Sequence, residues 1–260
     1  MKQLILLTVG TALLVSSCAP RYTASPPDAG ATPDPDALLK SMSASLASAK
    51  TYRLTATRTI SDDLAKKMRQ PSKTHVDVAV ARPDKLAVKV SGKTAVRSMI
   101  FDGRAFTVVD EENNFYSTAP LRGTLNLVPA SLEKIYGFQP PLAEFIVSDP
   151  YQDIKHRVTG VSYLGRGSVR EGGKTVQCHR IGLHGTAADA ELWLGGGDSL
   201  PRRLKATAKN SGSRDLLMDV DFLSWDMNPP LSGSTFDFKP RSGAVEIPMI
   251  SLAEAKTKSR

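Results

Sequence analysis

Two long stretches of the chain alternate between apolar and polar residues, and this alternation restricts the fold more than any other feature. The first stretch covers residues 51–119 and begins TYRLTATRTI, and the second covers residues 157–227. A period of two places successive side chains on opposite faces of a β-strand. Turn residues such as Asp102-Gly103 divide each stretch into strands joined by hairpins. Strand–helix–strand alternation does not occur, so the sequence predicts an α+β fold with one large, curved antiparallel sheet.

Helical spacing occurs at two places outside these stretches. Residues 34–50 carry apolar side chains at a spacing near 3.6, with Asp34 or Asp36 placed to cap a helix. Residues 124–154 have the same spacing in two pieces, which Pro140-Pro141 separates. A sheet of this size must curl or be covered. We therefore expect a half-open β-barrel whose concave face is covered by these helices.

The start of the chain is typical of an export signal. Lys2 supplies a positive charge, and an apolar run follows that is too short for a comfortable transmembrane helix. The run ends in Val15-Ser16-Ser17-Cys18, which resembles the bacterial lipoprotein signal, in which the cysteine receives lipid. The alternative is an ordinary secretory signal with a chance cysteine. The resemblance implies a signal peptide over residues 1–17 and a membrane anchor formed by diacylglyceryl and acyl groups on Cys18.

This division predicts the organisation of the mature protein. Residues 18–35 are rich in Pro, Ala, Ser and Thr and are predicted to form a flexible tether. Residues 36–248 suit one domain, and residues 249–260 form a C-terminal tail. Ala19 replaces the aspartate that favours inner-membrane retention in enterobacteria, which implies the outer membrane, with the domain facing the periplasm. Cys178 has no disulfide partner once Cys18 is lipidated, and its place in an alternating stretch predicts a buried, inert thiol.

Neither charge nor motifs favour nucleic-acid binding or catalysis. The net charge of +8 is not clustered as in an RNA-binding motif, and anionic lipids are the available polyanions outside the cytoplasm. The histidines lack metal-ligand spacing, so we expect no metal, and we expect no cofactor. The glycine-rich LGGGDS lacks the following Lys-Ser/Thr of a phosphate-binding loop and predicts a hairpin turn. A catalytic triad built from distant residues stays open, but the sequence favours a protein that is not an enzyme.

The closing segment of the chain resembles that of the lipoprotein-carrier (LolA/LolB-like) superfamily. The matching residues are Trp225, Pro229, Phe236, Phe238, Pro240 and Gly243. The stretches RPDKLAV, FDGRAFTVVDEENNFYSTAP, PLAEFIVSDPY and ELWLGGGDSLPRRL are similar to predicted periplasmic proteins of unknown function, domain-of-unknown-function family 2092. The resemblance implies an open antiparallel barrel covered by helices, and an envelope location. It implies no activity.

A curved sheet with an apolar concave face can hold acyl chains, since burying each methylene contributes about 0.8 kcal/mol. The sequence therefore predicts a protein that binds lipid or lipoprotein acyl chains. The alternative is an envelope sensor that binds a protein partner through the same groove. For each wall residue the alternative is an ordinary filled core. The candidate wall residues are Leu54, Val76, Val78, Leu86, Val88, Phe106, Trp193 and Phe222, and the candidate lid residues are Leu132, Ile135, Leu142 and Phe145.

Overall fold

A computed structural model describes residues 32–68, 70–93, 95–209 and 215–258. Residues 33–260 form one compact unit, which contains the described helices and strands. The predicted signal peptide, Cys18 and almost all of the tether lie outside the described residues. Because the unit has its own hydrophobic core, it meets the physical requirement for folding on its own.

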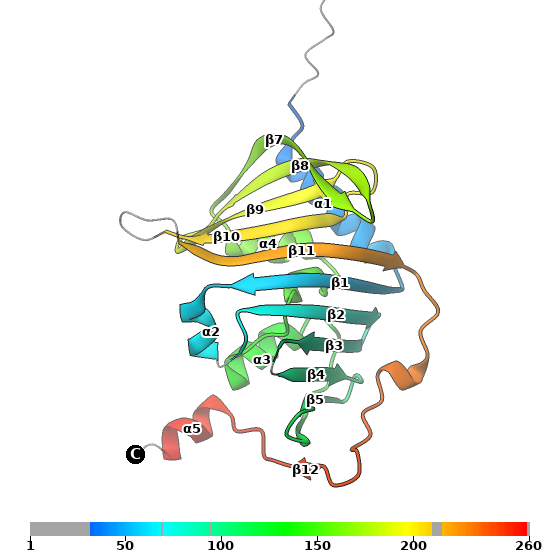
Figure 1. Cartoon of the computed structure of the whole chain (residues 1–260), viewed down its shortest axis with the longest axis vertical. Coiled ribbons are helices and arrows are strands. Elements are labelled where there is room, and N and C mark those ends of the chain that lie inside the picture. The colour runs from blue at the N-terminus through cyan, green and yellow to red at the C-terminus, as the bar shows by residue number, and fades with distance from the viewer. Residues whose placement is uncertain (1–31, 69, 94, 210–214, 259–260) are drawn as a thin grey trace, which may run out of the picture. The chain divides into compact units, whose positions relative to one another are not determined.

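The described strands form a single 12-stranded sheet in the order β12-β6-β5-β4-β3-β2-β1-β11-β10-β9-β8-β7 (Figure 1). All neighbours are antiparallel except β12 and β6, which are parallel. The strands are β1 (Thr51–Ile60), β2 (Lys73–Ala81), β3 (Lys85–Ser91), β4 (Val96–Phe101), β5 (Ala105–Asp110), β6 (Phe115–Pro120), β7 (Gly160–Glu171), β8 (Lys174–His184), β9 (Ala188–Gly195), β10 (Pro201–Ala208), β11 (Leu216–Met227) and β12 (Val245–Glu246).

The first strand joins the two alternating stretches into one sheet. Leu54 in β1 lies opposite Val78 in β2 on one side and opposite Trp225 in β11 on the other. The sheet is curved (Figure 1). Its edge strands β12 and β7 lie at opposite ends and do not pair with each other, so the sheet is open and does not close into a barrel. The predicted α+β fold class is confirmed.

Helices cover one face of the sheet and lie behind it in Figure 1. The helix predicted near the start of the domain is α1 (Pro35–Ser48), and the side chain of Asp34 caps it by accepting from the backbone N–H of Asp36. The stretch with helical spacing in the middle of the chain forms α3 (Val128–Tyr136), the 3-10 turn η1 (Ala143–Phe145) and α4 (Pro150–Arg157). Their buried side chains share one core with the inward-facing residues of the sheet.

Two short helices were not predicted. Helix α2 (Asp62–Met68) lies between β1 and β2, inside the first alternating stretch. It carries two aspartates in its first turn and two lysines in its last turn. Both pairs stabilise the helix, because their charges interact favourably with the helix dipole. Helix α5 (Leu252–Lys258) forms within the predicted C-terminal tail. Leu252 lies against Gly137, which ends α3 in the left-handed conformation at φ +77°.

After β11 the chain passes the ends of the first strands, as the orange and red segment of Figure 1 shows. It includes the 3-10 turn η2 (Gly233–Thr235) and reaches the far edge of the sheet, where β12 pairs with β6. The rings of Phe238 and Tyr116 lie with their centroids 5.0 Å apart. Met249, beyond β12, packs against the core. The closing segment therefore connects the last strand with the opposite edge of the sheet.

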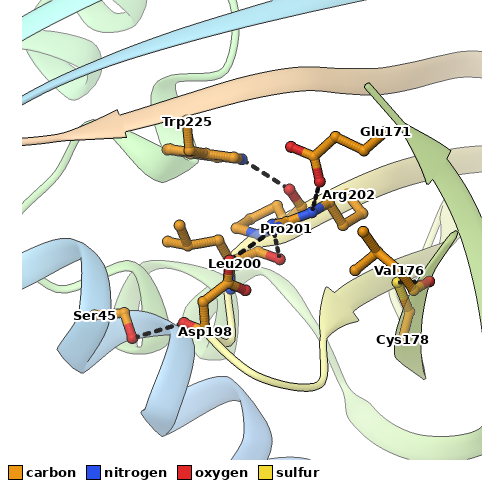
Figure 2. A network of polar contacts seen from close by, with 9 residues as sticks. All are labelled: Ser45, Glu171, Val176, Cys178, Asp198, Leu200, Pro201, Arg202 and Trp225. Atoms are coloured by element: carbon orange, nitrogen blue, oxygen red, sulfur yellow. Dashed lines mark hydrogen bonds and ion pairs between the residues drawn. The ribbon is translucent and has the colours of Figure 1, made fainter. Parts of the chain in front are cut away.

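A buried arginine organises the other end of the sheet (Figure 2). The Arg202 guanidinium is 8% exposed and donates to Glu171 at 2.7 Å and to Asp198 at 2.6 Å. The backbone carbonyl of Asp198 accepts from Ser45 of α1, so the cluster also fastens a helix to the sheet. Asp198 belongs to the LGGGDS stretch, which forms the turn between β9 and β10. Nearby, Cys178 is buried and free.

Candidate functional site

A cavity of about 410 Å³ lies on the helix-covered face of the sheet, near α2. We call it the concave-face cavity. Apolar side chains make up most of its lining, and its polar side chains include two arginines. The lining residues are Arg58, Gln70, Pro71, Thr74, Val90, Ala95, Arg97, Met99, Val108, Ser117, Phe138, Gln139, Pro141, Pro248 and Met249.

The floor of the cavity is the inward face of neighbouring strands. Met99 in β4 lies opposite Val108 in β5, and Val90 in β3 is one inward position beyond Val88. The alternation of each strand directs these side chains to the helix-covered face. The cavity therefore continues the core along the strands, toward the ends near α2.

Two segments far apart in the chain close the cavity. Phe138 and Pro141 come from the link between α3 and η1, and Met249 comes from the closing segment after β12. Phe138 is held by ring contacts, with centroids 6.1 Å from Phe106 and 6.4 Å from Tyr136. The cover of the cavity is therefore formed by the closing segment after β12 as well as by the link between α3 and η1.

Arg58 is the most unusual residue of the lining. It occupies an inward position of β1, in phase with the buried Leu54, Ala56 and Ile60, and is only 7% exposed. Its Nη2 donates to the side-chain oxygen of Gln70 at 3.0 Å. Its Nε is buried and has no hydrogen-bond partner among the described residues. A charged donor is therefore held at the wall of an apolar cavity with part of its hydrogen-bonding capacity unused.

Burial also shifts the ionisation of this region. It lowers the pKa of Arg58, and the negative charge of Glu144 in η1 partly opposes that shift. Burial raises the pKa of Glu144, against the attraction of Arg157 and Arg58. Within the described part of the chain Glu144 and Arg58 form no ion pair with each other, so Arg58 keeps no anionic partner at contact distance.

The structure places the predicted wall and lid residues elsewhere. Ten of the twelve are buried in the shared hydrophobic core and line no part of the concave-face cavity. They are Leu54, Val76, Val78, Leu86, Val88, Phe106, Phe222, Leu132, Leu142 and Phe145. Phe145 and Phe222, for example, are packed edge to face at 5.3 Å. In the structure these side chains pack against one another as part of the core.

The other two candidates are corrected. Trp193 lies on the opposite face of β9 from the buried Leu192 and Leu194, because successive side chains of a strand alternate. Its ring stacks under Arg180, 5.1 Å from the centroid, and its Nε1 donates to Glu191. Ile135 is 39% exposed, since it faces outward from α3 rather than into the core.

Sequence reasoning missed the residues that do line the cavity. Val90, Met99 and Val108 follow the same alternation as the predicted wall residues, one step farther along or across the strands. Arg58 could have been found from the sequence, because it is a charged residue at a position of TYRLTATRTI where the alternation predicts a buried, apolar one. The covering residues Phe138 and Met249 carried no local signal, because only the fold brings their segments together.

Among the described residues, no group of three or more His, Cys, Asp or Glu side chains is placed to hold a metal ion. None of the described helices is long and apolar enough to cross a membrane.

Residues 35–250 match the family model described as predicted periplasmic protein, DUF2092. The chain belongs to this family. The family assignment predicted from the sequence is therefore confirmed, and for DUF2092 the description specifies a predicted compartment and no activity. No curated protein matches the chain.

Several solved structures resemble this DUF2092 protein at low identity. An uncharacterised conserved protein from Thermus thermophilus has a TM-score of 0.48 at 10% identity, over 82% of this chain and 97% of that one. The MucA/MucB complex of Pseudomonas aeruginosa has a TM-score of 0.47 at 12% identity, over 80% of this chain and 62% of that one. A LolA superfamily protein from Nitrosomonas europaea has a TM-score of 0.34 at 10% identity, over 78% of this chain and 96% of that one.

Proposed function

We propose that this chain is a membrane-anchored lipoprotein of the bacterial envelope that binds acyl chains of lipids or lipoproteins, without catalysis, in the concave-face cavity. The observation that carries the proposal is the cavity itself. Its volume of about 410 Å³ lies within the roughly 300–1,000 Å³ of small-molecule sites, which are mostly apolar with a few placed polar groups. Its floor and cover match that description.

Acyl chains suit the lining better than polar ligands do. Val90, Met99 and Val108 form the floor, and Phe138 and Met249 lie over it. Methionine side chains adapt to flexible apolar ligands. Each methylene taken from water contributes about 0.8 kcal/mol, so a chain of ordinary length gains several kcal/mol without any covalent step.

The membrane anchor rests on the sequence. Cys18 ends a signal that resembles that of bacterial lipoproteins, and residues 18–35 have the composition of a flexible tether. Acyl groups on Cys18 would hold the domain at a membrane, facing the periplasm, and Ala19 favours the outer membrane. A domain tethered in this way receives or holds lipid at one membrane, because it is not free to carry cargo across the periplasm.

The test uses residues 33–260, which lack the lipidation site and contain the described fold. We expect native mass spectrometry to detect a co-purifying lipid, and the fluorescent fatty acid cis-parinaric acid to bind after lipid removal. Val108→Trp fills the cavity and should weaken that binding at least about tenfold, which corresponds to loss of about two buried methylenes. Val109→Trp is the matched control, because Val109 lines a groove on the other face of β5.

Two results would count against the proposal. Protein that is free of lipid and does not bind the probe contradicts acyl-chain binding, and equal losses in both tryptophan variants contradict the assigned location. The alternative predicted from the sequence, a sensor whose groove holds a protein segment, then remains. Its signature would be binding of an envelope peptide that Val108→Trp blocks and Val109→Trp does not.

A further inference from the structure

We infer that the ligand of the concave-face cavity carries an anionic group, a carboxylate or a phosphate, that pairs with Arg58. The inference rests on the proposed function and specifies its ligand class: an amphiphile with one anionic end and an apolar chain. It assigns Arg58 as the residue that selects this class.

The Arg58 side chain is buried and only partly hydrogen-bonded. An arginine residue that is 7% exposed has lost most of its contact with water, and burying a charge is unfavourable unless it is paired and hydrogen-bonded. Gln70 supplies one neutral acceptor, and Nε has none among the described residues. An oxyanion in the cavity would supply the missing acceptor and the missing charge, in the geometry that guanidinium groups favour.

The charged side chains that line the cavity are positive. Two arginines, Arg58 and Arg97, line it, and within the described chain none of its lining residues is acidic. Glu144 acts electrostatically on Arg58 and lines a different pocket, and Asp110, which lies opposite Arg97 in the sheet, lines a neighbouring pocket rather than this one. The lining therefore favours a negative ligand group over a neutral or positive one.

Arg58 and the apolar floor residues occupy different strands of the sheet. Arg58 belongs to β1, whereas the apolar floor residues belong to β3, β4 and β5. Neighbouring strands are about 4.8 Å apart. Arg58 and the apolar floor are therefore separated in the direction across the strands, from β1 toward β5. A single-chain amphiphile with its anionic head at Arg58 lays its chain over Val90, Met99 and Val108.

The experiment compares cis-parinaric acid with its methyl ester, which has the same chain and no charge, on residues 33–260 at pH 7.5. We expect the acid to bind at least about tenfold more tightly, as one charge-assisted hydrogen bond predicts. Arg58→Met should abolish the preference for the acid over the ester, and Arg58→Lys should retain part of the preference. Arg53→Met is the matched control, since Arg53 is exposed on the same strand.

A competition experiment distinguishes an anionic lipid headgroup from free phosphate as the ligand of Arg58. Lysophosphatidic acid should displace the probe, whereas inorganic phosphate at the same concentration should not, because it has no chain to bury. Displacement by inorganic phosphate alone would overturn the amphiphile assignment.

The outcomes also separate this inference from the proposed function. Equal binding of the acid and the ester to the unmodified sequence would overturn the role of Arg58 and leave acyl-chain binding intact, and this comparison needs no variant to fold. Failure of both probes to bind would contradict the proposed function itself. A preference for the acid that survives in a folded Arg58→Met protein would also overturn the assignment.

Discussion

The hydroxyl group of Tyr52 donates a hydrogen bond of 2.7 Å to the backbone carbonyl of Phe145, and both residues are fully buried. This bond joins the first strand of the sheet to the 3-10 turn that covers it. Arg82 strengthens the same connection by donating to the carbonyls of Ile146 and Val147. The segment around η1 is therefore held to the sheet by buried polar contacts as well as by apolar packing.

Tyr52→Phe should destabilise the protein. The change leaves the carbonyl of Phe145 buried without its partner, and such a loss typically lowers the free energy of unfolding by about 1–3 kcal/mol. Urea denaturation of residues 33–260 measures it. Tyr116→Phe is the control, because its exposed hydroxyl makes only a long contact of 3.4 Å with Glu246. Equal stability of Tyr52→Phe and the unmodified protein would contradict the prediction.

Glu171→Gln should weaken the cluster around Arg202 in Figure 2. The arginine is nearly buried and would keep Asp198 as its single anionic partner, so we expect a loss of about 1.5–3 kcal/mol in unfolding free energy. Asp221→Asn serves for comparison, since Asp221 is 60% exposed in its 3.6 Å contact with Arg203 and exposed pairs contribute at most about 1 kcal/mol. A larger loss in Asp221→Asn would refute this ranking.

Glu144→Gln should stabilise the protein at pH 8 and not at pH 4. Burial raises the pKa of Glu144 in the folded state above its ordinary value of 4.5. A carboxyl group with a raised pKa contributes stability that is fully present below the unfolded pKa and is lost as the pH rises through the folded pKa. Replacing it with a neutral amide removes that loss. Urea denaturation at both pH values tests the sign, and a gain that is the same at both would be inconsistent with it.

Cys178 should resist thiol reagents in the folded protein. It is 2% exposed, and burial raises the pKa of its thiol, so both access and the thiolate fraction are low. Residues 33–260 contain no other cysteine, which makes Ellman's reagent at pH 8 specific for it. We expect reaction only after denaturation in urea. Rapid, complete labelling of the native protein would show that the thiol is accessible.

Much of the fold could be predicted from local patterns. Alternation in TYRLTATRTI and in the stretches after it predicts the strands, and Asp102-Gly103 predicts the turn between β4 and β5, where Gly103 has φ +88°. The spacing of α1 and its Asp34 cap are equally local. These features depend on residues that are close together in the sequence, so the conformational preferences of those residues predict them.

The candidate site could not be predicted in the same way. Alternation identifies Val88 and Val90 as inward core residues but cannot separate them, although only Val90 of the two lines the cavity. For Trp193 the pattern specifies two faces and leaves open which one is covered. A side chain that meets another side chain and one that meets a ligand have the same spacing.

The sequence by itself determined the strands, the antiparallel class, the family and the resemblance of Cys18 to a lipidation site. Tertiary structure alone decided where the core ends and the cavity begins. That boundary depends on Phe138 and Met249, which come from segments more than a hundred residues apart and line the same cavity as Val108. It also turned Arg58 from one charge in an alternating strand into a buried donor, because burial depends on what the rest of the chain places around it.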